Sequence, residues 1–511
     1  MEVSMGRAVA QLAFDDEDYV LFRVRLLQQL RTLADLTDRP GFGARPPTLG
    51  AELEMTLVGD HCRPVPLNAA VRDALRDDRL TLEVTRHNLE VNLTPVALAG
   101  RPFTALAEEA TQMLARVTAL ARVNHGAQAV SIGTLPTLTP ADLTDDALTP
   151  SPRYHALERA RVRRSPASFP LRMRGQEFLR AQSVAVQGAV CSWQVHLTVP
   201  PDRFNRTFNA AQFATGPALA AAGNSPLPLG RHGWQESRIA WYEQGFGDRR
   251  PGRGRGAPRP RVGFGRDWLR GSRSAGFEEA VRRYDVLLPD ITPGGDNREN
   301  TSGCPPLEEL RLHLSTVWSW NRPVYDPVGH LRIEFRALAA GPTPLDMAAN
   351  AAFLIGLTLS LTSEGHDVGA TLPFAYARSN FYRAARDGLS SSLWWPSSTS
   401  GAPREHRAAD LVRQLLPKAR SGLVSAGVNA AEADGLLDLL RHRVTTGRTG
   451  AQWQERALEA LDGLGTPTRL DRPDRRTSAL CELTDRYAQL AERQAPVHTW
   501  PLPPHSSWSP R

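Results

Sequence analysis

Glutamates spaced two apart in an apolar run are the first sign of chemistry in this sequence. The run GAELEMTLVG (50–59) carries Glu52 and Glu54 among Ala, Leu, Met, Thr and Val. On a β-strand, side chains at i and i+2 leave the same face, so both carboxylates would project from one side of an apolar strand. Like charges that close repel, and an ionised carboxylate is costly to bury without a partner. We therefore expect positive charge nearby.

Three further segments place polar groups on one face of a strand: LTLEVTRHNLEVNLT (80–94), CSWQVHLTV (191–199) and HLRIEFRAL (330–338). A single strand of this kind usually belongs to an antiparallel sheet with one solvated face. The four segments taken together differ from an ordinary solvated face, because their acids are all glutamates and the polar residues that accompany them include Asn, Gln, His and Arg. The candidate residues are Glu83, Glu90, Asn92, Gln194, His196, Arg332, Glu334 and Arg336.

Glutamates gathered on one concave surface need cations. Mg²⁺ and Mn²⁺ prefer hard oxygen ligands, and two or three ions could neutralise five carboxylates. Neighbouring arginines would then hold an anion that also contacts the metal, such as a phosphate or a carboxylate. This combination favours phosphoryl transfer from a metal-bound nucleotide. No Walker-type GxxxxGK[ST] motif occurs, so metal bridging would have to hold the phosphates of ATP.

The composition excludes several other classes. The chain has 511 residues, 41% hydrophobic and 23% charged, which is enough for a large core. The net charge of +7 is modest for this length, and we expect no nucleic-acid binding. The four cysteines are far apart, which argues against zinc and a disulfide framework. The start lacks a secretory signal, and the longest apolar tract (348–361) reads as a buried helix, so we expect a soluble, cytoplasmic protein without a membrane span.

Hydrophobic spacing predicts the elements that must position these residues. Helices are expected at 17–36, 104–124, 151–164 and 205–226, and strands from about Leu49 and at 127–137, 188–200 and 329–338. The basic Gly/Pro-rich segment 248–265 is expected to be a flexible loop, with an anionic-substrate flap as the alternative. Further helices are expected at 404–425, 430–443, 450–463 and 478–493. We expect a helical segment (1–44), a catalytic domain (45–402) and a helical extension (403–511) that packs on the domain or forms a dimer interface.

The order of these motifs resembles the glutamate–cysteine ligase type 2 family. The motifs are GAELEMTLVG, LTLEVTRHNLEVNLTP, SPRYHAL, CSWQVHLTV, AGNSPLPLGRHGWQESRIAWYEQ and HLRIEFRALAAGPTPLD, over roughly residues 45–400. This family of bacterial carboxylate–amine ligases and plant-type glutamate–cysteine ligases has a glutamine-synthetase-like α+β fold, with a curved antiparallel sheet forming the active-site funnel. The nearest subgroup carries CBS domains after this domain. Because the present sequence ends soon after PVHTWPLP, we expect none here.

The resemblance implies a set of metal ligands. Glu52 and Glu54 would bind two different ions. Glu83 and Glu90 would join Glu54, and Glu334 would join Glu52. Gln194 stands where the family fold has a metal-ligating histidine, and its amide oxygen would be a weaker ligand than imidazole for Mn²⁺.

The same resemblance implies substrate and catalytic roles. Arg238 and Arg336 would be catalytic arginines that handle the substrate carboxylate and the phosphate. His196 would lie near the nucleotide phosphates, and Asn224, Ser225 and Arg332 would contribute to binding of substrate or ATP.

The implied reaction is the ATP-dependent formation of a γ-glutamyl amide through an acyl phosphate, with Mg²⁺ or Mn²⁺, as in glutathione biosynthesis. Cysteine is the family's commonest acceptor, and another amine or amino acid stays open. Gln194 motivates an alternative, a catalytically idle protein of the same fold that binds ATP or an amino acid and regulates. A nucleic-acid-binding protein using the basic loop is a further alternative. A homo-oligomer is compatible with the sequence.

Overall fold

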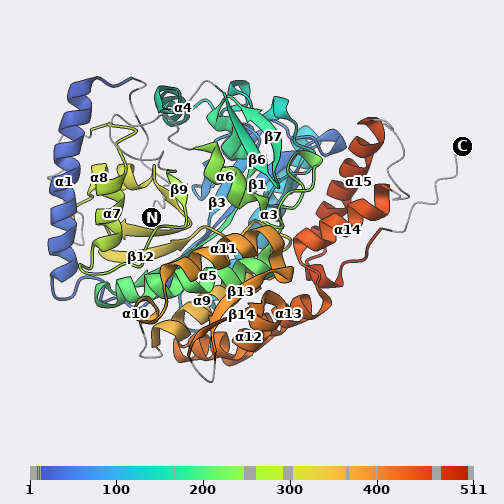
Figure 1. The fold of residues 1–511 in the computed structure, drawn as a ribbon. Helices are drawn as coiled ribbons and strands as arrows, with labels where there is room; N and C mark the ends of the chain where they lie inside the picture. Colours follow the sequence, from blue (N-terminus) through green and yellow to red (C-terminus); the bar gives the residue numbers. More distant parts are fainter. Residues whose placement is uncertain are drawn as a thin grey trace, which may run out of the picture.

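A curled antiparallel sheet occupies the centre of the computed structural model (Figure 1), which describes Val9, Gln11 and residues 13–164, 168–246, 260–291, 303–363, 367–397, 401–462 and 473–503. Its main path runs β11-β12-β8-β1-β3-β2, and both β4 and β5 pair with β1. The strands are β1 (Thr48–Val58), β2 (Leu80–Leu82), β3 (Asn88–Asn92), β4 (Val96–Ala97), β5 (Gln128–Val130), β8 (Trp193–Val199), β11 (Asn321–Asp326) and β12 (His330–Phe335). The expected α+β class with a curved antiparallel sheet is confirmed.

Alternation along β1 divides the sheet into an apolar face and a polar face. Leu49, Leu53 and Leu57 are buried in the main core. Burial of such side chains contributes roughly 1.5–3 kcal/mol each. The pleat sends Glu52 and Glu54 to the other face. The same alternation continues along β8 and β12, so the polar residues of three neighbouring strands share one surface.

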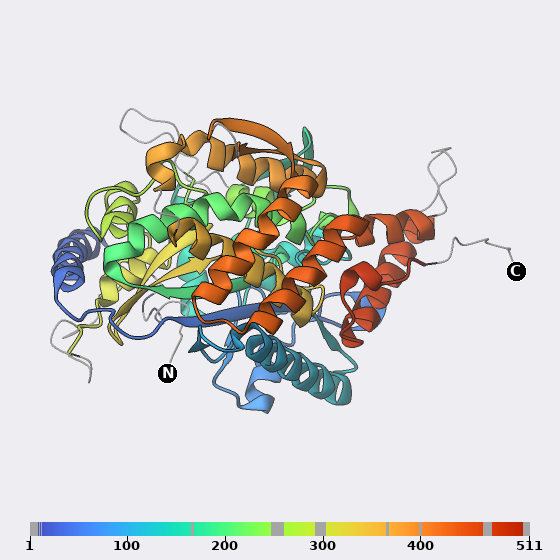
Figure 2. The same ribbon diagram turned by 90° about the horizontal axis from the view of Figure 1, so that it is seen from below.

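Helices cover the apolar face of the sheet and the two ends of the molecule. Helix α9 is largely buried and packs against α3, α5, α12 and α13. Figures 1 and 2 show α1 at one end of the molecule and α14 and α15 at the other. The helices are α1 (Asp16–Asp38), α2 (Asn68–Leu75), α3 (Pro102–His125), α4 (Pro152–Arg164), α5 (Phe204–Ala222), α6 (Ser237–Gly245), α7 (Ala275–Arg283), α8 (Glu308–Leu314), α9 (Pro344–Ser363), α10 (Val368–Thr371), α11 (Phe374–Asp387), α12 (Ala408–Ser425), α13 (Ala430–Thr446), α14 (Gly450–Asp462) and α15 (Pro473–Glu492).

Helix α9 is also the one helix of the described chain that is long and apolar enough to cross a membrane. Most of its residues are buried inside the protein, as expected for the core helix predicted at 348–361. Its apolar side chains therefore pack against the neighbouring helices inside the protein.

The C-terminal helices join two cores. Helices α12 and α13 contribute to the main core, whereas α14 and α15 belong to a second core shared with the hairpin of β6 (Phe169–Met173) and β7 (Gln176–Ala181). Trp453, Tyr487 and Trp500 form an aromatic cluster there, with T-shaped contacts between Trp500 and each of the other two rings. The proposed division of the chain at residues 44 and 402 stays a prediction.

Several predicted elements differ from the observed ones. Residues 80–95, which alternate like one strand, form the two paired strands β2 and β3. The helix predicted at 404–425 begins only at Ala408, because β14 (Pro403–Arg407) pairs with β13 (Ser392–Pro396). The strand predicted at 127–137 is limited to β5. Of the basic loop 248–265, residues 248–259 lie outside the described part, and Val262–Gly263 form β9, which pairs with β10 (Trp318–Ser319).

Candidate active site

Strand pairing brings the predicted carboxylates together on the polar face of the sheet. The paired positions are Glu52 with Gln194, Glu54 with Glu90, and Glu334 with His196. Residues that are distant in sequence thus become neighbours, because side chains opposite each other in antiparallel strands lie about 5 Å apart. Two groups of possible metal ligands result.

The first group, the glutamate triad, consists of Glu54, Glu83 and Glu90. One carboxylate oxygen from each lies within 4.8 Å of the others. Burial, reinforced by the neighbouring carboxylates, raises the pKa of Glu90 well above its usual value and that of Glu83 to about 8. Burial also raises the pKa of Glu54, against the attraction of Arg238 and Arg336. Three carboxylates this close therefore require protons or a cation.

The second group, the mixed triad, consists of Glu52, His196 and Glu334, whose ligand atoms also lie within 4.8 Å of one another. His196 Nε2 lies 3.0 Å from Glu52 Oε1. Burial alone would raise the pKa of Glu334, but the guanidinium groups of Arg322 and Arg336 hold it below its usual value. Arg336 Nη1 donates to Glu334 Oε1 at 2.7 Å, and Arg322 Nη2 donates to the same oxygen at 3.0 Å.

Both triads fit divalent cations. Glu52 Oε2 and Glu90 Oε2 are buried and have no hydrogen-bond partner among the described residues. Such buried polar atoms are costly unless something satisfies them. Carboxylate oxygens with a single imidazole suit Mg²⁺ or Mn²⁺. The structure thus groups the five glutamates into the two sets that the family resemblance implies, and it places His196 within the second set.

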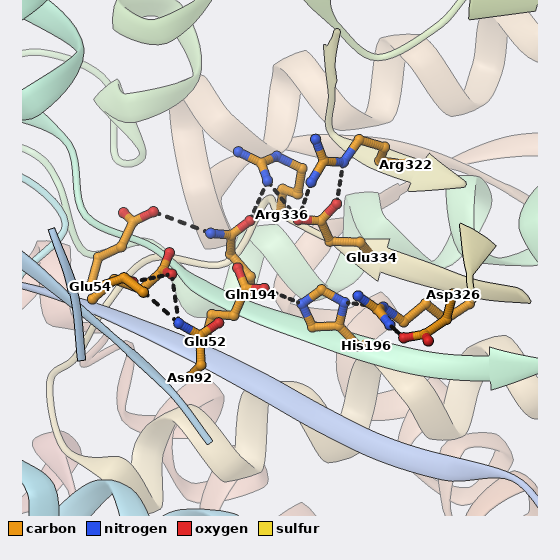
Figure 3. A network of polar contacts seen from close by, with 12 residues as sticks. Glu52, Glu54, Asn92, Gln194, His196, Arg322, Asp326, Glu334 and Arg336 are labelled. Carbon is orange, nitrogen blue, oxygen red and sulfur yellow. Dashed lines mark hydrogen bonds and ion pairs between the residues drawn. The ribbon is translucent and has the colours of Figure 1, made fainter. Parts of the chain in front are cut away.

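Gln194 lies between the two triads (Figure 3). Its Nε2 donates to Glu54 Oε1 at 3.2 Å, and its Oε1 accepts a hydrogen bond from Arg336 Nη1. The amide oxygen that the sequence suggested as a metal ligand is therefore engaged by a guanidinium. In this arrangement Gln194 links the glutamate triad to Arg336, and a ligand role stays a prediction.

A cavity lies on each side of this network. The larger, of about 660 Å³, is lined by Glu52, His196 and Arg332 together with Arg45 and Arg311. Arg332 Nε donates to His196 Nδ1 at 3.2 Å, and its Nη1 also binds Asp326.

The smaller cavity, of about 320 Å³, is lined by Glu54 and Glu83 and by several basic and aromatic side chains. These are Arg153, Tyr154, Arg238, Tyr242, Trp318, Trp320 and Arg336. Ser315 and Arg322 line both cavities, so the two meet beside Glu334.

The sequence reasoning missed several arginines that line the cavities, among them Arg322 and Arg153. Arg322 binds Glu334 from β11, whose residues alternate in burial although its sequence NRPVYD shows no alternation of apolar and polar residues. Arg153, on α4, donates to Ser315 Oγ at 3.0 Å, and its Nη1 is buried without a partner among the described residues. The motif SPRYHAL, which contains Arg153, predicts the start of a helix and belongs to the family pattern, but no role was predicted for Arg153.

Arg238 reaches the smaller cavity, but Asn224 and Ser225 do not belong to the described lining of either cavity. Both are fully buried. Asn224 N donates to Glu236 Oε2 at 3.0 Å and Ser225 Oγ donates to Glu236 Oε1 at 2.7 Å. Arg238 Nη1 in turn donates to Glu236 Oε1 at 3.2 Å. The contacts of Asn224 and Ser225 thus support Arg238, and direct contact of these two residues with substrate stays a prediction.

A comparison with known protein families identifies the family of this chain. The model described as glutamate-cysteine ligase family 2 matches residues 48–468. The chain belongs to this family. The resemblance inferred from the motifs is therefore confirmed, and the match runs past residue 402 into the C-terminal helices. No curated protein matches the chain in sequence. Membership in family 2 supports an ATP-dependent carboxylate–amine ligase as the enzyme class.

Solved structures share the fold at low sequence identity. A glutamate–cysteine ligase from Francisella tularensis, in complex with AMP, is 13% identical with a TM-score of 0.55, and 90% of each chain is covered. A bifunctional glutathione synthetase from Pasteurella multocida is 12% identical with a TM-score of 0.45, covering 93% of this chain and 55% of that one. The ligase PafA, in complex with the ubiquitin-like protein Pup, is 12% identical with a TM-score of 0.40, covering 87% and 72%. At these identities the first comparison shows the fold alone, and the other two carry no argument.

Proposed function

We propose that this protein is a ligase of the glutamate–cysteine type, which activates the side-chain carboxylate of glutamate with ATP and joins it to an amine. The observation that carries the proposal is the pair of adjacent triads with a cavity on each side. A reaction that transfers a phosphoryl group between two anionic substrates needs positive charge at their meeting point. The two cavities meet at Arg322, beside the mixed triad.

The larger cavity is assigned to ATP. Its volume of about 660 Å³ exceeds that of the other cavity, and ATP is the larger substrate. Arg45, Arg311 and Arg332 in its wall provide positive charge for phosphates. Two members of the mixed triad, Glu52 and His196, contribute to its wall.

The smaller cavity is assigned to the acid. Arg153, Arg238 and Arg336 line it, and a volume of about 320 Å³ suits a compact amino acid with two carboxylates. Arg153 Nη1 and Arg238 Nε are buried without partners among the described residues. Each offers a donor that a substrate carboxylate would satisfy.

The glutamate triad and the mixed triad would each hold one Mg²⁺ or Mn²⁺ ion, which when bound would supply positive charge to the phosphates and the reacting carboxylate. Arg322 and Arg336 would hold the transferring group, and an arginine so placed is worth about 10³-fold or more in rate. A carboxylate oxygen of the acid attacks the γ-phosphorus, and the bond to the bridging oxygen breaks to release ADP. The amine nitrogen then attacks the acyl carbon, loses a proton, and phosphate leaves.

Gln194 supports a second candidate, a protein of this fold that binds ATP or an amino acid without turnover. This position carries an amide instead of an imidazole, and Arg336 donates a hydrogen bond to the amide oxygen. Such a protein would bind nucleotide with Mg²⁺ and release no ADP in the presence of any acid and amine.

A coupled assay of ADP release decides between the candidates. The full chain is incubated with ATP, Mg²⁺ or Mn²⁺, a panel of acids including glutamate, and a panel of amines including cysteine. We expect ADP release that requires an acid and an amine and yields the amide by mass spectrometry. Glu482→Gln, at an exposed carboxylate of α15, is the control that should match wild type. Nucleotide binding without ADP release across the panel would contradict ligase activity and favour the second candidate.

A further inference from the structure

Helix α15 reaches the active-site arginine through a buried tyrosine. Tyr487 lies outside residues 48–468, the part that matches the family, and its side chain is fully buried. The Asn224 side chain donates from Nδ2 to the Tyr487 hydroxyl at 2.8 Å, and that hydroxyl donates to the Ser131 carbonyl at 3.0 Å. A residue from the C-terminal region is thus bonded to the turn that precedes Glu236.

The hydrogen bonds continue from this turn to Arg238. Asn224 N and Ser225 Oγ donate to the two carboxylate oxygens of Glu236. Glu236 accepts from Arg238 Nη1 at 3.2 Å, and Ser225 Oγ also accepts from Arg238 N at 3.2 Å. Arg238 is only 3% exposed, lines the smaller cavity, and keeps Nε without a partner among the described residues. Tyr487 and the cavity are therefore joined by an unbroken chain of buried contacts.

Both polar atoms of the Asn224 side chain are hydrogen-bonded within this network. Nδ2 also donates to the Ala340 carbonyl at 2.7 Å, and Oδ1 accepts from Gln454 Nε2 at 2.8 Å. Close packing holds the side chain in place, since a Cβ atom added at Gly450 would lie 2.1 Å from Asn224 Oδ1. A Cβ added at Gly341 would lie 2.5 Å from the Tyr487 hydroxyl. Loss of one bond in a saturated, tightly packed network is transmitted to its neighbours rather than absorbed by water.

We propose that Tyr487 is a positioning residue for Arg238, so that α15 is part of the acid-binding apparatus; this rests on the proposed function, in which Arg238 contacts the carboxylate of the acid. The hydroxyl fixes Asn224, Asn224 and Ser225 fix Glu236, and Glu236 orients the guanidinium. Tyr487 does not contact the acid. Its removal should weaken binding of the acid and leave nucleotide binding and the chemical step unaffected.

The test compares Tyr487→Phe, which removes only the hydroxyl, with Trp500→Phe, which alters the same aromatic cluster without touching Asn224. Loss of a buried hydrogen bond worth about 1 kcal/mol corresponds to about fivefold in an equilibrium constant. We expect the KM for the acid to rise about fivefold in Tyr487→Phe, with kcat and the KM for ATP within about twofold of wild type. Trp500→Phe should leave all three near wild type. Equal changes in the two variants, or no change in Tyr487→Phe, would overturn the proposal.

Hydrogen exchange followed by mass spectrometry separates this inference from the proposed function, because it needs no turnover. We expect peptides within residues 223–240 to exchange faster in Tyr487→Phe than in wild type or Trp500→Phe. If wild type releases no ADP and this difference is present, the proposed function fails and the coupling of Tyr487 to the Arg238 segment holds. If wild type is active and the difference is absent, the coupling fails alone. Gln454→Met, which removes the other side-chain partner of Asn224, should reproduce the effect in the event that Tyr487→Phe folds poorly.

Discussion

Replacing Arg322 by alanine tests the electrostatics of the mixed triad. Arg322 is bonded to both carboxylate oxygens of Glu334, with the arginine side chain 12% exposed and the glutamate fully buried. Removing one member of a buried ion pair costs about 3–5 kcal/mol, because the remaining charge is left uncompensated. Arg336 still donates to Glu334 at 2.7 Å, so we expect the low end of that range, about 3 kcal/mol.

A divalent cation should offset part of this loss. If an ion binds Glu52, His196 and Glu334, it supplies the positive charge that Arg322→Ala lacks, and a ligand that binds only the folded state stabilises it. In EDTA the variant should therefore unfold at a clearly lower temperature than wild type. Saturating Mn²⁺ should raise the unfolding temperature of the variant more than that of wild type.

The assay is thermal unfolding followed by tryptophan fluorescence, with EDTA or Mn²⁺. Arg486→Ala is the matched control, because Arg486 pairs with Glu482 on the surface and such pairs contribute about 0–1 kcal/mol. The double variant Arg322→Ala with Glu334→Gln should be more stable than Arg322→Ala alone, since it removes the orphaned charge. The reasoning is refuted if Arg322→Ala unfolds like wild type in EDTA, or if Mn²⁺ stabilises both proteins equally.

Three further outcomes are expected. The pKa of Glu83 is raised from 4.5 to about 8, so between these pH values the metal-free folded state holds a proton that the unfolded state has lost. The stability of the metal-free protein should therefore fall as pH rises from about 5 to 8, and Mg²⁺ should remove most of this loss. Melting temperatures that rise over this range in the absence of metal would contradict the prediction. Arg443→Met breaks a buried ion pair with Asp346 on α9 and should cost about 3–5 kcal/mol of stability. The affinity for ATP, measured by calorimetry at low temperature, should stay unchanged, and a changed affinity would show that this pair is coupled to the site. Glu334→Gln should abolish amide formation with the circular dichroism spectrum preserved, and calorimetry showing unaltered metal-dependent ATP binding would count against Glu334 as a metal ligand.

The faces of the strands could be predicted from sequence because strand geometry has a period of two. Glu52 and Glu54 leave one face of β1 whatever the rest of the chain does, and the same holds for Glu334 on β12. The grouping of the glutamates came from the family resemblance. The register of the strands explains this grouping, since Glu54 pairs with Glu90 and Glu334 pairs with His196. No local pattern encodes that register.

The remainder of the site depends on contacts across long stretches of sequence. Arg153 enters from a helix, and its link to Ser315 joins segments 162 residues apart. The contact between the Gln194 amide oxygen and Arg336 joins residues 142 apart, and no local pattern indicates it. Nothing in the NSP turn indicates that Tyr487 and Gln454 contact the Asn224 side chain.

The central claim is that two divalent ions neutralise the two triads, and Mn²⁺ binding to the nucleotide-free protein tests it most directly. Equilibrium dialysis with wild type, Glu52→Gln and Glu90→Gln counts the ions on each protein. Two ions per wild-type chain are predicted, with each variant losing one and keeping the other. A wild-type chain that binds no Mn²⁺, or variants that bind as many ions as wild type, would contradict the account.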